Sequence, residues 1–189
     1  MLLIVGLGNP GKDYEGSRHN AGFRVIELLS RQVRTGLPEK GSTYLYQKSS
    51  YRNNSIILAQ PLTYMNRSGY AVVSLLKVNK IKPEDMLVIY DELDLPPGTI
   101  RLKRGGGSAG HRGVQSIIDV IGTESFDRLR VGIGKPPVKT EGGEYVLGYI
   151  DQQEKILLEE AIERAAKATL TYISEGINMA MNLFNRGVE

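Results

Sequence analysis

The chain has 189 residues, of which 41% are hydrophobic and 24% charged, with no cysteine and a formal net charge of +3. This length and balance predict one globular domain over residues 1–189 with a substantial core. They exclude a disulfide framework, a thiolate metal site and a cysteine nucleophile. No apolar run is long enough to cross a membrane and no signal peptide is indicated, so we expect a cytoplasmic protein without membrane contacts.

The amino-terminal half alternates short apolar runs with amphipathic segments. In chain order the pattern predicts a buried strand at 2–6, a helix at 20–32, a hairpin of 44–50 and 55–61, and a helix at 69–78. The first helix is indicated because Val25, Leu28 and Leu29 lie near one face.

The carboxyl-terminal half continues the alternation. It predicts a buried strand at 86–90, a strand at 99–104, a helix with the apolar stripe Val114, Ile117, Ile118 and Ile121, a strand at 128–134, and a long helix from Asp151. Glu154 is placed for a capping box with Asp151, and Gly176 is expected to interrupt this last helix. Buried strands alternating with helices indicate an α/β fold: a single domain with a central mixed, largely parallel sheet surrounded by helices.

Polar groups follow several of these strands. Asn9, Asn66 and Asp91 each come after a strand, and the glycine loop at 105–107 follows the strand at 99–104. If these strands run parallel, all four emerge at one edge of the sheet, where ligands bind in open α/β folds. His19, a few residues after Asn9, is close enough along the chain to reach the same crevice.

The two histidines, His19 and His111, lie in polar, glycine-flanked runs. Imidazole can take and return a proton near neutral pH, and an aspartate that accepts from one ring nitrogen raises the basicity of the other. We expect Asp91 to support His19 as a general base, with Asp94 as the next candidate. Each histidine also fits a solvated residue or a helix cap, and Asp91 also fits a turn residue. With no paired ligand spacing, we expect no metal ion.

Basic residues are concentrated between positions 101 and 139. They are Arg101, Lys103, Arg104, Arg112, Arg128, Arg130, Lys135 and Lys139, against Asp119, Glu124 and Asp127. Such a segment fits either a solvated face or a surface that recognises phosphates.

Two short motifs point to other functions and weaken on inspection. Gly6, Gly8 and Gly11 match the dinucleotide-binding pattern, but the long segment before the first helix disfavours it. Gly106, Ser108 and Gly110 match a serine-hydrolase elbow, but no histidine follows His111 to serve as its base.

Five ordered motifs together resemble bacterial peptidyl-tRNA hydrolase, the enzyme that cleaves the ester joining a stranded peptide to tRNA. They are GLGNPG-x-x-Y-x-x-x-RHN-x-G, P-x-x-YMN-x-SG, DELDLPPG, GGGSAGHRG and RLRVGIG, and they span nearly the whole chain. The resemblance implies a monomeric, metal-independent α/β hydrolase that needs no cofactor and acts on peptidyl-tRNA.

The resemblance also assigns roles to residues. It implies that His19 is the catalytic base, that Asp91 supports it and that Asn9 recognises the peptide beside the ester. Tyr14, Tyr64 and Asn66 correspond to substrate-contacting positions, and the tRNA phosphate would be held by Arg101, Lys103 and Arg130, with Arg104 as an addition. Residues 136–150 resemble the mobile flap beside the family's cleft.

Arg112 departs from the pattern, because many relatives have asparagine there to position substrate or water. Arginine offers donors and no acceptor, so we predict that Arg112 binds substrate and does not accept a proton. Two rival functions stay open: a non-catalytic RNA-binding protein on the same fold, and a small-molecule esterase, which would not need the basic segment.

Overall fold

The computed structural model describes residues 1–136 and 141–185, and its centre is a seven-stranded sheet in the order β2-β3-β4-β1-β5-β7-β6. The strands are β1 Leu2–Gly6, β2 Glu39–Lys40, β3 Tyr44–Tyr51, β4 Asn54–Pro61, β5 Met86–Glu92, β6 Ile100–Arg104 and β7 Asp127–Gly132. The central strands β4, β1, β5 and β7 are parallel, whereas β2, β3 and β6 pair antiparallel with their neighbours. The predicted α/β fold with a mixed, largely parallel sheet is confirmed.

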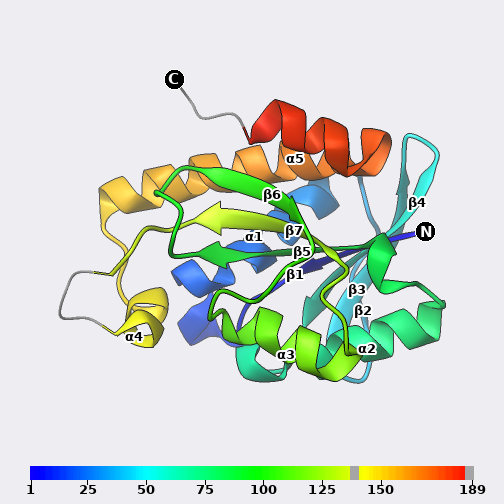
Figure 1. The fold of residues 1–189 in the computed structure, drawn as a ribbon, viewed down its shortest axis with the longest axis horizontal. Coiled ribbons are helices and arrows are strands. Elements are labelled where there is room, and N and C mark those ends of the chain that lie inside the picture. The colour runs from blue at the N-terminus through cyan, green and yellow to red at the C-terminus, as the bar shows by residue number, and fades with distance from the viewer. Residues whose placement is uncertain (137–140, 186–189) are drawn as a thin grey trace.

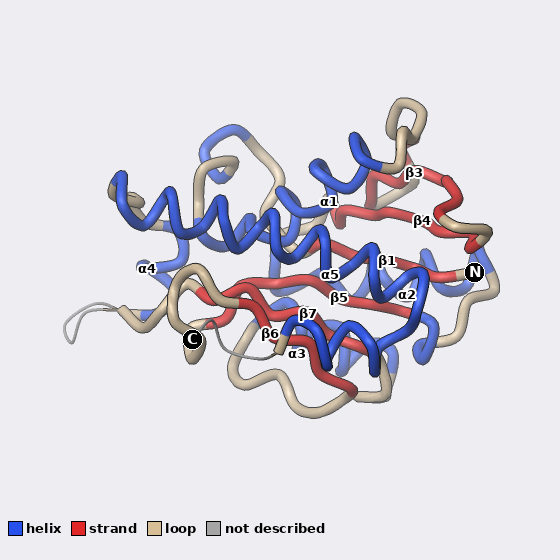
Figure 2. Tube along the Cα trace, turned by 90° about the horizontal axis from the view of Figure 1, so that it is seen from above, coloured by secondary structure: helices blue, strands red, loops and turns tan. Residues whose placement is uncertain are grey.

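Helices cover both faces of the sheet (Figures 1 and 2). They are α1 Ala21–Gln32, α2 Ser68–Asn79, α3 Arg112–Ile121, the short α4 Gly142–Leu147 and α5 Gln152–Phe184. One core lies under α1 and α5 and contains Val25 and Leu129, and the other lies under α2 and α3 and contains Leu75 and Val88. No helix in the described residues is long and apolar enough to cross a membrane.

Local predictions agree well with the structure. The hairpin turns at Arg52 and Asn53, whose φ angles of 44° and 66° are those of a tight two-residue turn. Asp151 and Glu154 form the predicted capping box at the start of α5, and Gly176, with φ 82° and ψ 174°, interrupts that helix.

The path of the glycine loop corrects one prediction. Because β6 runs antiparallel to β7, Arg104 lies opposite Asp127, and Asp127 lies opposite Leu87 near the start of β5. Gly105 therefore emerges at the opposite edge of the sheet from Asp91, and the prediction that the loop emerges at the same edge is wrong. The loop then runs back, held by a hydrogen bond from Arg128 to the carbonyl of Gly107, and reaches the other edge at His111.

Candidate active site

At the carboxyl end of β5, both histidines contact one carboxylate. Asp91 is the buried sixth residue of β5, and its Oδ1 lies 2.8 Å from Nδ1 of His19 and 3.0 Å from Nε2 of His111. His19 lies in a 3-10 turn, Arg18–Asn20, directly before α1, and His111 is the N-cap of α3. The predicted His19–Asp91 pair is therefore formed, and His111 is a second partner that the sequence did not indicate.

The hydrogen bonds fix the tautomer of each ring. Nδ1 of His111 accepts from the backbone N–H of Val114 at 3.2 Å, so its proton lies on Nε2 and is donated to Asp91. Since an ionised Asp91 can only accept, His19 donates from Nδ1 and keeps the lone pair on Nε2. His19 is thus oriented as a general base.

Asp91 is held in its charged form. Burial would raise its pKa, but the two histidines, through their charge and their hydrogen bonds, outweigh burial and hold the pKa of this carboxyl well below its ordinary value. The carboxylate is therefore available to stabilise a positive charge on His19.

Candidate metal-binding atoms of His19, Asp91 and His111 lie within 4.8 Å of one another. A metal bound through Nε2 of His111 would require the proton to move to Nδ1, where it would face the N–H of Val114. The same atoms satisfy one another as hydrogen-bond partners, so the cluster fits a proton-handling site better than a metal site.

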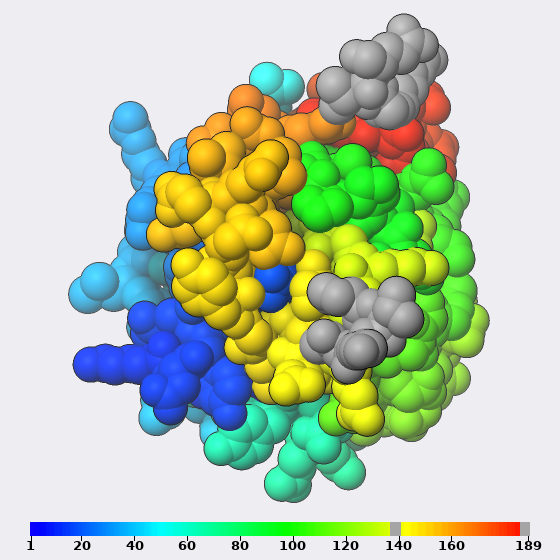
Figure 3. Space-filling model, turned by 90° about the vertical axis from the view of Figure 1, so that its left-hand side faces the viewer, coloured from blue at the N-terminus to red at the C-terminus, as the bar shows by residue number. Residues whose placement is uncertain are grey.

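A cleft of about 270 Å³ opens over this cluster. Its lining consists of His19, Asp91, Glu92, Leu93, Ala109, Gly110, His111, Arg112, Gly142, Gly143 and Val146. Figure 3 looks onto this edge of the molecule, where the yellow residues around α4 lie beside the blue segment that follows β1. The helix α4 is thus one wall of the cleft, within the segment that resembles the family's flap; residues 137–140 of that segment lie outside the described residues.

Asn9 is buried and lines a second hollow of about 450 Å³, with Asn20, Phe23 and Gln60 among its neighbours, and not the cleft over Asp91. It is held at three points. Its Oδ1 accepts from the backbone N–H of Met65 at 2.8 Å, and its own backbone N–H and carbonyl bond to the side-chain amide of Asn20 at 2.8 and 3.0 Å. This arrangement leaves Nδ2 of Asn9 without a partner among the described residues, available to a ligand. The sequence did not identify Asn20 as the residue that fixes Asn9.

The other predicted substrate contacts lie around this edge. Tyr14 is half-buried in a 3-10 turn, Tyr64 is exposed, and Asn66 is exposed in the 3-10 turn Met65–Arg67. That turn is joined to Asn9 through Met65, but the structure shows no hydrogen bond from these three side chains to His19 or Asp91 in the described residues. Arg112 is exposed and lines the cleft.

The basic residues divide between two faces of the sheet. Arg101 lies opposite Arg130 and Lys103 opposite Arg128, so these four share one face, where Arg101 and Lys103 are exposed. Arg130 donates to Glu92 at 3.1 Å, and Arg128 is buried.

Three further basic residues stand apart from that face. Arg104 points to the other side, where its charge acts on Asp127 and on Tyr172 of α5. Lys135 pairs with Asp94 at 3.2 Å, so the alternative aspartate for His19 faces a lysine instead. Lys139 lies outside the described residues.

The two competing motifs have structural explanations. Only the three-residue 3-10 turn Lys12–Tyr14 follows Gly11, and the α-helix α1 begins at Ala21, so the α-helix that a dinucleotide site requires does not open behind the third glycine. Ser108 is buried and donates to Oε1 of Gln115 at 2.6 Å, and no hydrogen bond among the described residues joins its hydroxyl to either histidine ring.

Comparisons with known proteins agree with this geometry. The family model described as peptidyl-tRNA hydrolase matches residues 3–189. The chain is 46% identical to the peptidyl-tRNA hydrolase of Aquifex aeolicus, covering 97% of this chain and 96% of the relative, and 43% identical to that of Sulfurihydrogenibium sp., covering 98% and 97%. Among solved structures, peptidyl-tRNA hydrolase from Acinetobacter baumannii superimposes with a TM-score of 0.90 at 40% identity, covering 96% of this chain and 93% of that one.

Proposed function

Because the chain belongs to the peptidyl-tRNA hydrolase family, we propose that His19, supported by Asp91, activates water to hydrolyse the ester between peptide and tRNA. The observation that carries this proposal is the 2.8 Å hydrogen bond from Nδ1 of His19 to the buried Asp91, which leaves Nε2 as a base facing the cleft. The comparisons give no support to the alternative of a non-catalytic RNA-binding protein.

The reaction needs one base and no covalent intermediate. Nε2 of His19 takes a proton from water as the oxygen attacks the ester carbonyl, and the imidazolium is stabilised by Asp91. The same proton is then given to the departing ribose oxygen, so a free carboxyl group and a free tRNA hydroxyl are the products. Ser108, bonded to Gln115, has no part in this scheme.

Asn9 is proposed to recognise the peptide beside the ester. Its oxygen is already occupied by Met65, so the amide group Nδ2 is the atom available to a substrate carbonyl or to the developing oxyanion. Tyr14, Tyr64 and Asn66 are proposed to contact substrate from the surrounding turns.

Tyr64 has 62% of its surface exposed, so its ring can be covered by a substrate group.

The exposed basic face of β6 and β7 is proposed to hold the tRNA phosphates. Arg101 and Lys103 project from this face, and Arg130 is beside them although Glu92 already binds part of its guanidinium. We leave Arg104 out of the surface because its side chain lies on the face covered by α5.

Lys103→Met is expected to raise KM for peptidyl-tRNA and to reduce the slope of log binding against log salt by about 0.7–0.9, the value of one phosphate contact. The measurement is hydrolysis of an N-blocked aminoacyl-tRNA over a salt series, beside a short N-blocked ester without the tRNA body. Only the tRNA substrate should respond.

Arg104→Met is the matched control, because it removes the neighbouring charge from the opposite face. Equal losses for both substrates in Lys103→Met would contradict the proposed surface, and absence of any peptidyl-tRNA cleavage by the parent protein would contradict the proposed function.

Arg112→Ala is expected to raise KM with a smaller change in kcat. An exposed guanidinium at the cleft can bind a phosphate or stack on a base, an interaction shared by ground and transition states. Arg112→Asn should retain or improve turnover. Steady-state kinetics on peptidyl-tRNA tests this, and a collapse of kcat at unchanged KM in Arg112→Ala would place the guanidinium at the reacting carbonyl instead.

We also propose that the protein acts as a monomer in the cytoplasm. The hydrogen bonds that hold His19, Asp91, His111 and Asn9 in place are completed within the chain, which supports the first point, and the family's substrate is a product of translation, which supports the second.

A further inference from the structure

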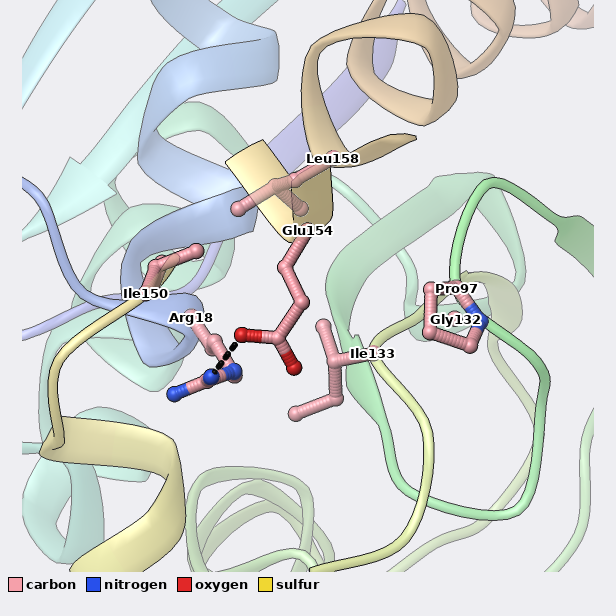
Figure 4. Close-up of a pocket in the computed structure, with 7 residues that line it drawn as sticks. All are labelled: Arg18, Pro97, Gly132, Ile133, Ile150, Glu154 and Leu158. Carbon is pink, nitrogen blue, oxygen red and sulfur yellow. Dashed lines mark hydrogen bonds and ion pairs between the residues drawn. The ribbon is translucent and has the colours of Figure 1, made fainter. Parts of the chain in front are cut away.

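Arg18, the residue before His19, is buried and its guanidinium joins three segments of the chain. Its Nη1 donates to the carbonyls of Tyr145 at 2.9 Å and Gly148 at 3.4 Å, and its Nη2 donates to Oε2 of Glu154 at 2.5 Å. Figure 4 shows Arg18 and Glu154 pointing toward each other across a small pocket, Glu154 from the first turn of α5. A buried arginine with this many partners is fixed in position.

The contacts with Tyr145 and Gly148 are at the carboxyl end of α4. The last carbonyls of a helix lack partners within the helix, and a cation there stabilises them. The guanidinium also lies over the ring of Tyr145, 4.1 Å from its centroid. With only Gly142–Leu147, α4 is too short to be stable by itself, so its position depends on such contacts.

Tyr145 and Glu154, the partners of Arg18, also bond to other parts of the protein. The hydroxyl of Tyr145 donates to the carbonyl of Ile133, which follows β7, at 2.9 Å. Glu154 accepts from Arg18 while it completes the capping box of α5. The end of α4 is therefore clamped between the turn that carries His19 and the start of α5.

We propose that Arg18 is a positioning residue that fixes α4 as the wall of the catalytic cleft at a set distance from His19. The backbone of Arg18 is continuous with His19, and Gly142, Gly143 and Val146 of α4 line the cleft over that histidine. The width of the space that receives substrate is thus set by a side chain that does not itself line it. Only the expected effect on KM rests on the proposed function; the positioning of α4 does not.

The test compares Arg18→Met with Arg18→Lys in the full chain. In Arg18→Met, KM for peptidyl-tRNA should rise about tenfold or more, the effect of losing a hydrogen bond to a charged group, with a smaller change in kcat. Arg18→Lys should recover part of this, because it restores the charge but not the planar set of donors. Hydrogen exchange should accelerate at the amides of Tyr145 and Gly148, which are bonded to Glu141 and Tyr145.

Arg24→Met is the matched control. Arg24 also pairs with an acid of α5, Glu159, but this pair is more exposed and makes no contact with α4 among the described hydrogen bonds. Arg24→Met should leave KM for peptidyl-tRNA and the hydrogen exchange of the α4 amides unchanged. If Arg18→Met does not fold, Glu154→Gln replaces it, since glutamine keeps the capping box and removes the partner charge.

Two results would overturn the proposal: unchanged exchange at the α4 amides in a folded Arg18 or Glu154 variant, or a fall in kcat at constant KM. The exchange measurement uses no substrate, so it tests the role of Arg18 even if the parent protein does not cleave peptidyl-tRNA.

Discussion

His19→Ala is expected to lower kcat for peptidyl-tRNA by about 10²- to 10⁴-fold, the usual contribution of a general base. This substitution removes Nε2 of His19, the only ring nitrogen in the described cleft with an available lone pair. Nε2 of His111 carries a proton that it donates to Asp91, and Nδ1 of His111 accepts from Val114. Affinity for tRNA should hardly change, since the basic face of β6 and β7 is untouched. Single-turnover hydrolysis and equilibrium binding of deacylated tRNA measure the two effects separately.

His111→Gln is the control for this experiment. A glutamine amide can still donate to Asp91, whereas it cannot act as a base. We expect a smaller loss than in His19→Ala, and a loss larger than that of His19→Ala would show that His111 and not His19 is the base. Turnover of His19→Ala near that of the parent would remove His19 from the mechanism.

The sequence predicted the helices and strands because their signals are local. Apolar periodicity identified α1 and α3, and paired turn residues identified the hairpin of β3 and β4. The direction of β6 depends on which strand it pairs with. The assumption of a parallel β6 was wrong although the chain holds a signal against it: only residues 93–99 connect β5 to β6, whereas a parallel crossover needs about a dozen residues or more.

The site was predictable where it depends on strand ends. Asn9 and Asp91 follow neighbouring parallel strands, so the sheet brings them to one edge. The contact of His111 with Asp91 depends on a glycine loop that runs back from the opposite edge, and the pairing of Arg18 with Glu154 joins residues far apart in the chain. The spacing of residues along the sequence predicts neither of these two contacts.

Asp91→Asn is expected to lower kcat by removing charge while keeping the geometry. His111 donates from Nε2 to the position of Oδ1, so the asparagine is expected to turn its amide oxygen toward His111. The same oxygen can still accept from Nδ1 of His19. As a general rule, an opposite charge at this distance favours the ionised form of its partner by roughly 1–3 pKa units. Loss of the carboxylate charge should therefore destabilise the imidazolium that forms during the reaction and lower kcat by about 10- to 10³-fold. Steady-state kinetics against the parent measures this, and KM should change less.

The same substitution has a consequence for stability against pH. The pKa of Asp91 is held below its ordinary value in the folded protein, so the carboxylate stabilises the fold at pH above the unfolded value of about 3.9, and this contribution is lost as pH falls through the folded value. The unfolding free energy of the parent should therefore fall more steeply in acid than that of Asp91→Asn, as measured by urea unfolding from pH 7 downward. Identical acid dependence in the two proteins would contradict a charged, histidine-stabilised Asp91, and the loss of kcat would then need another cause, such as rotation of His19 away from the cleft.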